Sequence, residues 1–428
     1  MKKQFAATLI LGLASVAMAA GCSTQSDAYK PGDAVKVGLI CLHDTSSTYD
    51  KNFIDSMKAA VKNLGAKVDG DAIVKTGVPE DVEAYTAAKD LVKQGCNVIF
   101  ADSFGHEAHI LRAAKEFPNV TFCHATGTQA KVAGVKNFHN AFASIYEGRF
   151  LAGYAAGLKL QRMIDAGSLT DQNYSGDNIK LGYVGAYPYA EVVSGFTSWY
   201  LGVKEVVSNV VMDVTFTSSW YDFDAEKAGA RLLGDRGAAI ISQHADSMGA
   251  PGECESLGIP NVTYNIPTGD KCPNTYLAYS KIDWAPYYEA VVNAVFAGKA
   301  IEGEVNNNWT GTIGTGSVIY DAATASDKAA LEAVKAELVA GTRKVFDCSK
   351  FTVRNAKADT SEFSKAGSIT MDADGHLTGY KADVDDMGDF VPETEVIKTA
   401  GGKTYFDESA LRSAPYFDIT IDGITALN

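Results

Sequence analysis

Apolar runs without two-residue alternation recur along the chain between residues 36 and 265. Such runs are typical of parallel strands that helices cover on both faces of a sheet. Between them lie stretches with apolar residues at three- and four-residue spacing, such as 82–95, which ends on Gly95. The pattern therefore predicts two doubly wound α/β lobes. Their strands are expected at 36–42, 72–78, 96–102, 120–125 and 135–142, and then at 179–186, 210–220, 238–243 and 261–265.

The chain is expected to pass between these lobes more than once. It first crosses within residues 142–147, and the helical pattern at 284–299 followed by a strand-like run at 311–321 indicates further crossings. Two lobes joined by several short segments make a hinged clamshell, which binds its ligand between the carboxyl edges of the two sheets. We assign 36–143 and 275–307 to an N-terminal lobe, and 144–274 and 308–345 to a C-terminal lobe.

The pattern changes beyond Phe346. Residues 368–384 are typical of a β-hairpin that turns at Asp374 and Gly375, and the chain ends in FDITIDGI before its last residues. We predict that residues 346–428 form a C-terminal extension packed on the clamshell and not an independent catalytic domain.

The first 21 residues have the pattern of a secretory signal peptide, with two lysines, an apolar run and then small residues. The apolar run is too short to span a membrane. The text AAGC, which ends at Cys22, is similar to a bacterial lipobox and makes Cys22 a candidate for lipidation. Because the usual leucine is replaced by Ala19, plain secretion stays open as the alternative. Residues 22–35 are expected to form a polar linker.

Composition narrows the function classes. The chain has 428 residues, of which 46% are hydrophobic and 21% charged, so it can fill two or three cores. Its net charge of -14 argues against a nucleic-acid partner, which would require basic surface.

Cysteine placement leaves the disulfide state partly open. Cys41, Cys96 and Cys123 fall on apolar strand runs. In a parallel sheet of order 2-1-3-4-5, Cys41 and Cys123 would lie two strands apart, roughly 9.6 Å, which is too far for a disulfide. We expect these three to be buried thiols. Cys254 and Cys272 flank one short strand and are compatible with either a disulfide or two thiols.

Aromatic rings, carboxylates and hydroxyl groups gather where the predicted strands end. A flat heterocycle with N–H or O–H donors suits such surroundings, because rings stack on its faces and carboxylates accept its hydrogen bonds. Candidate stacking residues are Tyr49, Phe104 and Trp220, and candidate acceptors are Asp50, Asp222 and Asp246. The alternative is that the rings fill the lobe cores and that Asp50 or Asp222 only caps the helix behind it.

Other kinds of site fit the sequence less well. The loop 43–53 has no glycine and carries two aspartates, which excludes a phosphate cradle. His106 and His109 have the spacing of one helix face, but no carboxylate follows at metal-binding spacing, so we expect no metal site. GxSxG is absent, and the neighbours Cys123 and His124 point to opposite faces of a strand. We therefore expect neither an enzyme nor a cofactor.

Several segments, taken in order, resemble the basic membrane protein family. They are NFIDSMKAAVKNLGAKV, ADSFGHEAHILRAAKEFPNVTFCHATG, YEGRFLAGYAAGLK, GYVGAYPYAEVVSGFTSWYLGVKEV, SSWYD and GAAIISQHADS. The resemblance runs from about residue 36 to residue 345. It implies the type I periplasmic-binding-protein fold and the role of a lipoprotein that binds substrate for an ABC importer. Characterised members bind purine nucleosides, and the branch with SFG, HATG, YEGR, WxD and QHxDS segments is similar to purine nucleobase binders.

The resemblance also implies ligand-binding positions, with Tyr49 stacking on the base. Nucleoside binders of the family hold ribose through a serine and a lysine before the helix expected at Trp284, and residues 279–283 do not match that register. A free base is therefore favoured, with nucleosides left open. By position, the implied ligand-binding residues are Tyr49, Asp50, Asn52, Ser103, Phe104, Gly105, Glu147, Trp220, Asp222, His244 and Asp246.

Taken together, the residues and the resemblance predict a solute-binding lipoprotein on the extracytoplasmic face of the cell membrane. It would capture a purine base or nucleoside and deliver it to the permease and ATPase subunits of an ABC importer, without a cofactor, a metal or a nucleic acid. Two alternatives stay open: a sensor that signals through a membrane receptor, and binding of a different small polar ligand. An extracellular hydrolase is disfavoured because no nucleophile and base are paired.

Overall fold

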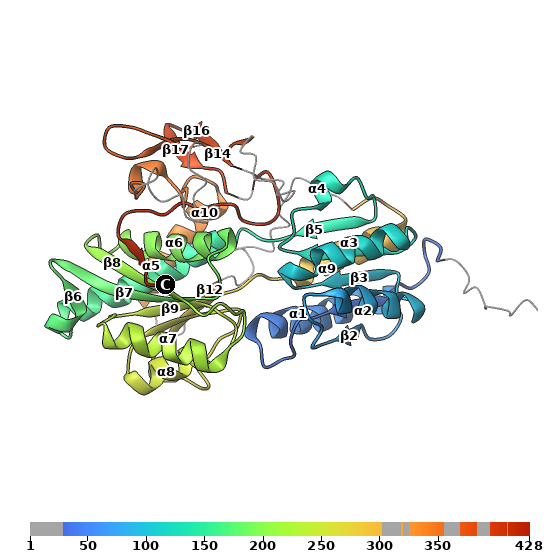
Figure 1. Cartoon of the computed structure of the whole chain (residues 1–428), viewed down its shortest axis with the longest axis horizontal. Coiled ribbons are helices and arrows are strands. Elements are labelled where there is room, and N and C mark those ends of the chain that lie inside the picture. Colours follow the sequence, from blue (N-terminus) through green and yellow to red (C-terminus); the bar gives the residue numbers. More distant parts are fainter. Residues whose placement is uncertain (1–28, 302–317, 320–324, 355–368, 383–393, 409) are drawn as a thin grey trace, which may run out of the picture.

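The computed structural model describes residues 29–301, 318–319, 325–354, 369–382, 394–408 and 410–428. Two α/β lobes lie side by side, and residues from the C-terminal part of the chain pack on one of them (Figure 1). The expected signal peptide, Cys22 and the first half of the linker lie outside the described residues. No helix in the described part of the chain is long and apolar enough to cross a membrane.

The first lobe contains a five-stranded parallel sheet of order β2-β1-β3-β4-β5, which confirms the predicted order. Side chains alternate between its faces, because successive residues of a strand point in opposite directions. Leu39 and Phe100 share one core with α1 and α9, whereas Ile40 and Ile99 share another with α2 and α3. Both faces are thus covered, as the continuous apolar runs predict. The strands are β1 (Val37–Ile40), β2 (Ile73–Lys75), β3 (Val98–Ala101), β4 (Thr121–Ala125) and β5 (Phe138–Ala141), and the helices are α1 (Thr48–Leu64), α2 (Val82–Lys93), α3 (Glu107–Glu116), α4 (Ala130–Ala133) and α9 (Ala285–Ala297), with 3-10 turns η1 (Gly65–Lys67) and η2 (Phe104–His106).

The second lobe contains a larger sheet of order β12-β11-β10-β9-β7-β8-β18, with β6 paired to β7 at its side. Helices α5 and α6 pack closely on each other and share a core with this sheet, while α7 and α8 enclose a smaller core with β7 and β9. Its strands are β6 (Tyr174–Ser175), β7 (Asn178–Gly185), β8 (Val210–Phe216), β9 (Ile241–His244), β10 (Asn261–Tyr264), β11 (Tyr276–Ser280), β12 (Val318–Ile319) and β18 (Ile424–Ala426), and its helices are α5 (Ile145–Asp165), α6 (Ala190–Lys204), α7 (Phe223–Asp235), α8 (Gly249–Leu257) and α10 (Ala325–Val339), with the 3-10 turn η3 (Asp171–Asn173).

The crossings between the lobes lie close to, but not always at, the expected positions. The first falls between β5 and α5, within residues 142–147. The expected N-terminal lobe includes 275–280, yet β11 pairs in parallel with β10 and so belongs to the second sheet. The second crossing therefore lies between β11 and α9, and α9 packs against α1 in the first lobe.

The C-terminal extension packs on the second lobe and also completes its sheet. Its predicted hairpin forms from β13 and β14, with Gly375 at φ 90° in the turn, a backbone conformation that favours glycine. Phe417 stacks on Phe346 with ring centroids 4.1 Å apart, and β18 pairs in parallel with β8. The elements of the extension are the 3-10 turn η5 (Cys348–Lys350) and strands β13 (Ile369–Met371), β14 (Leu377–Ala382), β15 (Thr394–Glu395), β16 (Ile397–Ala400) and β17 (Lys403–Phe406).

All six cysteines among the described residues are buried thiols that form no disulfide. The expectation for Cys41, Cys96 and Cys123 is confirmed. Of the two possibilities for Cys254 and Cys272, the structure shows two thiols.

Candidate functional site

A pocket with about 360 Å³ of empty space lies between the two lobes. Its walls come from the carboxyl ends of β1, β3 and β4 in the first lobe, and from the ends of β9 and β10, the start of α6 and the segment before α7 in the second. This is the edge at which doubly wound sheets bind ligands. The lining residues are Leu42, His43, Tyr49, Asp50, Ser103, Phe104 and Thr126 from the first lobe, and Glu191, Trp220, His244, Asp246 and Tyr264 from the second.

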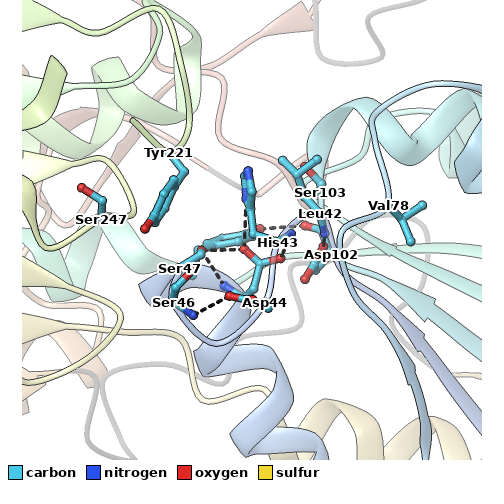
Figure 2. A network of polar contacts seen from close by, with 12 residues as sticks. Leu42, His43, Asp44, Ser46, Ser47, Val78, Asp102, Ser103, Tyr221 and Ser247 are labelled. Atoms are coloured by element: carbon cyan, nitrogen blue, oxygen red, sulfur yellow. Dashed lines mark hydrogen bonds and ion pairs between the residues drawn. The ribbon is translucent and has the colours of Figure 1, made fainter. Parts of the chain in front are cut away.

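Asp50 fixes the loop that leads from β1 into α1. The backbone N–H of His43 donates to Asp50 Oδ1 at 2.8 Å, and Ser47 Oγ donates to Asp50 Oδ2 at 2.5 Å. Ser47 is also the N-cap of α1 and accepts from the Asp50 N–H, which is why the helix begins at Thr48. Burial opposes a charge on Asp50, but the hydrogen bonds from His43 and Ser47 outweigh it and lower the pKa of this carboxyl. Figure 2 shows the loop from Leu42 to Ser47, with Tyr221 of the second lobe facing it.

Asp102 and Cys41 lie behind this loop and form a buried cluster with Asp50. Their ligand atoms lie within 4.8 Å of one another, a distance at which they could hold a metal ion. Asp102 Oδ1 accepts from the Leu42 N–H at 3.2 Å, while Asp102 Oδ2 lacks a hydrogen-bond partner among the described residues. Burial, and then the charge of Asp50, raise the pKa of Asp102 well above its usual range, and burial likewise raises the pKa of the Cys41 thiol. Since both Asp50 oxygens already accept hydrogen bonds from the loop, we interpret the cluster as support for the loop.

Tyr49 presents a fixed ring to the pocket. Its hydroxyl donates to the carbonyl of Asp102 at 2.9 Å, and its ring packs against Phe53 with centroids 4.8 Å apart. Phe53 in turn stacks on Trp284 at 4.5 Å. Burial raises the pKa of Tyr49 well above its usual range, so the ring stays neutral. A neutral ring held from behind is a suitable surface for a planar ligand.

More aromatic residues meet from opposite lobes. Phe104 stacks on Tyr189 of the second lobe with centroids 5.7 Å apart, and Tyr189 also contacts Trp220. Phe104 and Tyr189 are 38% and 44% exposed, which places their pair on the surface, and both Phe104 and Trp220 line the pocket. The rings therefore narrow the pocket opening.

Acidic groups line the second-lobe side of the pocket. Burial raises the pKa of Glu191, in the first turn of α6, to about 7, although the charge of Arg149 pulls it down. Burial also raises the pKa of Asp246 well above its usual range, and the charges of Asp50, Glu226 and Glu191 add to this effect. His244 Nε2 lies 3.4 Å from Glu191 Oε1, and burial lowers the pKa of His244 well below its usual range. A neutral histidine beside two carboxyl groups offers hydrogen-bond acceptors for N–H donors of a ligand.

Arg149 is the cation behind this wall. It is 1% exposed, its guanidinium carbon lies 3.6 Å from the centre of the Tyr264 ring, and one of its terminal nitrogens donates to the carbonyl of Gln243 at 2.8 Å. Nε and the other terminal nitrogen have no partner among the described residues. Arg149 thus supports the pocket residue Tyr264 and partly balances the charge of Glu191.

Glu147 does not line the pocket, whereas Arg149 of the same YEGR segment packs behind the pocket residue Tyr264. Positions two apart on a helix point to nearly opposite sides, so both cannot lie on the pocket side of α5. Glu147 lies instead in a separate hollow beside Lys344, where burial raises its pKa to about 7. Which of the two residues lies on the pocket side depends on how α5 is rotated about its own axis. The sequence does not reveal this rotation.

Three other expected residues also lie outside the pocket lining. Asn52 is buried and its side chain donates to the carbonyl of Ile282 at 2.9 Å, in the crossing between the lobes. Asp222 caps α7 by accepting from the Ala225 N–H at 2.9 Å, which was the stated alternative for this residue. The N–H of Gly105 donates to Glu80 Oε1 at 2.7 Å. The remaining seven expected residues line the pocket: Tyr49, Asp50, Ser103, Phe104, Trp220, His244 and Asp246.

Five lining residues are not among the expected ones: Leu42, His43, Thr126, Glu191 and Tyr264. Most of them directly follow or end a predicted strand. A prediction that took every residue at the strand ends would therefore have included them. Glu191 is different, because its only signal is a carboxylate in the first turn of a helix that follows a strand.

Comparison with known proteins agrees with this architecture. Residues 37–297 match the family model Bmp, described as ABC transporter substrate-binding protein PnrA-like. A purine-binding protein of Brucella abortus is 31% identical over 269 residues, which are 62% of this chain and 70% of that protein. A putative ABC transporter glucose-binding protein of Haloferax volcanii is 29% identical over 202 residues, 47% of this chain and 46% of that protein. The ABC transporter nucleoside-binding protein BmpA of Lactococcus lactis is 26% identical over 258 residues, 58% and 67% of the two chains.

A solved structure shows the same fold at low sequence identity. An ABC transporter solute-binding protein of Conexibacter woesei superposes with a TM-score of 0.54 at 20% identity, over 73% of this chain and 98% of that one. The expected clamshell of two α/β lobes is thereby confirmed. The family model covers more than half of the chain, and the family serves transport by binding a solute, without catalysis. The chain belongs to the Bmp family of PnrA-like substrate-binding proteins of ABC transporters.

Proposed function

We propose that this substrate-binding protein takes a purine base into the pocket between its lobes and delivers it to the permease of its transporter, with purine nucleosides as the neighbouring ligand class. One observation carries the proposal. Aromatic residues of both lobes, Tyr49 and Phe104 on one side and Trp220 and Tyr264 on the other, line one pocket together with the acidic residues Glu191 and Asp246. Rings offer stacking surface to a heterocycle, and carboxyl groups select its N–H donors.

The names of two relatives support this ligand class, and the name of a third points to a different ligand. The relative named purine-binding is matched over 70% of its length, and a second is named nucleoside-binding. The relative named as a putative glucose-binding protein is matched over 46% of its length. A sugar would also use rings and carboxyl groups, so it is the competing ligand that the experiment must include.

The ligand is tested by mass spectrometry of the small molecules that co-purify with the chain, followed by thermal shift with single compounds. We expect adenine, hypoxanthine or guanine to raise the melting temperature more than the matching nucleosides do, and glucose to have no effect. A larger shift with a nucleoside would move the ligand class from base to nucleoside. A shift with glucose or an amino acid and none with any purine would refute the proposal.

We also propose that Cys22 becomes the lipidated first residue of the mature protein and anchors it to the extracytoplasmic face of the membrane. The support is the sequence pattern of residues 1–22, which ends in AAGC. Mass spectrometry of the mature N-terminal peptide should show cleavage before Cys22 and a lipid adduct on it. A soluble mature form with an unmodified N-terminus at another residue would leave plain secretion as the explanation.

A further inference from the structure

We name residues 410–417 the C-terminal strap, and its residues 412–417 are buried although they lie near the end of the chain. Arg412 is 8% exposed and Ser413 is 4% exposed. In Figure 1 the red coil of the C-terminal part runs from the extension along the side that faces the first lobe before it reaches β18. Buried polar side chains in a terminal segment require partners, and the partners of the strap lie in both lobes.

The strap is anchored firmly to the second lobe. Its last residue, Phe417, stacks on Phe346, and Glu408 Oε2 accepts from the N–H groups of Tyr416 at 3.2 Å and Phe417 at 2.9 Å. Arg412 closes a turn within the strap, because Nε donates to the carbonyl of Ala414 at 3.0 Å and a terminal nitrogen donates to that of Pro415 at 2.8 Å. The strap therefore moves with the second lobe as one unit.

One side chain of the strap contacts the loop 126–129 of the first lobe. Ser413 Oγ donates to the carbonyl of Gly127 at 3.3 Å. Glu107 Oε1 holds the same loop by accepting from the N–H groups of Thr128 and Gln129, both at 2.8 Å. Arg412 acts through Ser413, because its hydrogen bonds to the carbonyls of Ala414 and Pro415 hold the turn in which Ser413 lies.

The loop matters because it begins at a pocket residue. Thr126 lines the pocket and has φ 62°, a left-handed conformation that a threonine adopts only when its surroundings hold it there. Gly127 follows in a tightly packed place, where a Cβ would fall 2.0 Å from Asn140 Nδ2 and 2.3 Å from Glu107 Oε1. The contacts that hold this loop therefore also determine where Thr126 stands.

We propose that Arg412 and Ser413 are positioning residues of the ligand pocket: the C-terminal strap, carried by the second lobe, holds the loop 126–129 of the first lobe in the closed form and thereby slows ligand release. The strap joins the lobes at a place outside the chain crossings, so opening the cleft must break its contact with Gly127. The prediction about the rate of ligand release rests on the proposed ligand class, whereas the prediction about lobe closure does not.

The test compares Ser413→Ala, Arg412→Met and Arg412→Lys in the full chain. Thr352→Ala is the control, because Thr352 Oγ1 donates to Asp422 Oδ2 at 2.6 Å, a hydrogen bond that lies wholly within the extension. Stopped-flow fluorescence with adenine gives the association and dissociation rates. We expect Ser413→Ala to raise the dissociation rate by about three- to tenfold, the effect of one lost hydrogen bond, with association changed less than about twofold. Arg412→Met should change both rates in the same way, because the turn that holds Ser413 loses its hydrogen bonds. Arg412→Lys should restore part of the slow release, and Thr352→Ala should leave both rates unchanged.

A second readout measures closure without any ligand. Spin labels at Val82→Cys in α2 and Leu232→Cys in α7, which replace residues that are 45% and 44% exposed, report the distance between the lobes. In Ser413→Ala and Arg412→Met the distribution of distances between the two spin labels should shift toward a wider separation. If adenine does not bind the unsubstituted chain, the proposed ligand class fails and the distance measurement still decides on the strap. A folded Ser413→Ala chain with unchanged distances and unchanged release would overturn the proposal.

Discussion

The backbone N–H of Thr48 donates to the carbonyl of Asp246 at 2.7 Å, directly from the first lobe to the second. His43 and Tyr221 also meet across the cleft, with ring centroids 5.3 Å apart. These contacts join the two walls of the pocket, so the structure represents the closed form of the clamshell. A ligand gains affinity from closure only as far as it binds the closed form better than the open one.

Tyr49→Ala removes the ring on which a planar ligand is expected to lie. Since stacking on an aromatic ring contributes about 1 to 3 kcal/mol, we expect calorimetry to show affinity for a purine base weakened by that amount. Tyr49→Phe is the matched control, because it keeps the ring and removes only the hydrogen bond to the Asp102 carbonyl. Equal affinities of the alanine variant and the unsubstituted protein would show that the ligand lies elsewhere.

Tyr49 also illustrates how much of the pocket can be predicted from the sequence. Strand ends and rings are visible in it, so the pocket wall around Tyr49, Phe104 and Trp220 is predictable. Which side of a helix faces the cleft is not visible in the sequence, so the sequence did not show that Glu147 lies outside the pocket and that Arg149 packs behind the pocket residue Tyr264.

The pairing of strands that lie far apart in the sequence is the second feature that the sequence does not predict. The apolar run of β11 is compatible with either lobe, and its pairing with β10 is decided by tertiary packing. Likewise, nothing local in the last residues announces that β18 joins β8, more than 200 positions earlier in the chain. Both cases concern which partner a strand selects, whereas the existence of the strand follows from its apolar residues.

As the pH rises from about 4.5 to about 7, Glu191 should lower the stability of the ligand-free protein, while the buried His106, His124 and His139, whose pKa values burial lowers to about 4, should raise it. Burial raises the pKa of Glu191 from its ordinary 4.5 to about 7, so the folded chain keeps a proton that the unfolded chain loses in this window. The contribution of Glu191 to the free energy of unfolding then decreases with pH, by about 3 kcal/mol for a shift of this size. Glu226 and Glu408, whose pKa values burial also raises to about 7, act in the same direction.

Urea unfolding at several pH values isolates the share of Glu191. The change in the free energy of unfolding from pH 4.5 to pH 7 should be more positive in Glu191→Gln than in the unsubstituted protein, because glutamine does not ionise. Glu83→Gln, on the exposed surface of α2, is the control and should leave the slope unchanged. An identical slope in Glu191→Gln would mean that this carboxyl is ionised in the folded protein.

Arg149→Met should destabilise the protein and change the same pH profile. The variant loses a cation stacked on Tyr264, an interaction that contributes about 2 kcal/mol when it is desolvated. It also removes the charge that lowers the pKa of Glu191, so the loss of stability should extend to higher pH. Arg149→Lys keeps the charge and loses the planar contact, and should therefore restore the pH profile more fully than the stability.

A matched control for Arg149 lies on the surface of the first lobe. The guanidinium carbon of Arg112 is 3.9 Å from the centre of the Tyr85 ring, and Arg112 is exposed. Because water competes for an exposed cation, Arg112→Met should cost only about 0.5 to 1 kcal/mol. Equal losses in the two variants would contradict a special role for the buried arginine.

Helices α5 and α6 approach each other so closely that glycine is required on both. A Cβ at Gly202 would fall 2.0 Å from the carbonyl oxygen of Phe150, and a Cβ at Gly153 would fall 2.0 Å from that of Trp199. Gly202→Ala must therefore separate the helices, and we expect thermal unfolding to show a loss of about 3 kcal/mol. Because α5 carries Arg149 and α6 carries Glu191, the separation also displaces the wall of the pocket, and ligand affinity should fall together with stability.

The opposite result is expected for a glycine in open surroundings. Gly252 lies within α8, and a Cβ there would meet nothing within 4 Å. Gly252→Ala should therefore stabilise the protein by about 0.5 to 1 kcal/mol, since alanine favours the helix and restricts the unfolded chain. Affinity should stay unchanged, because α8 contributes no residue to the pocket lining. If Gly202→Ala also left stability and affinity unchanged, the close contact between α5 and α6 would not be what holds Arg149 and Glu191 in place.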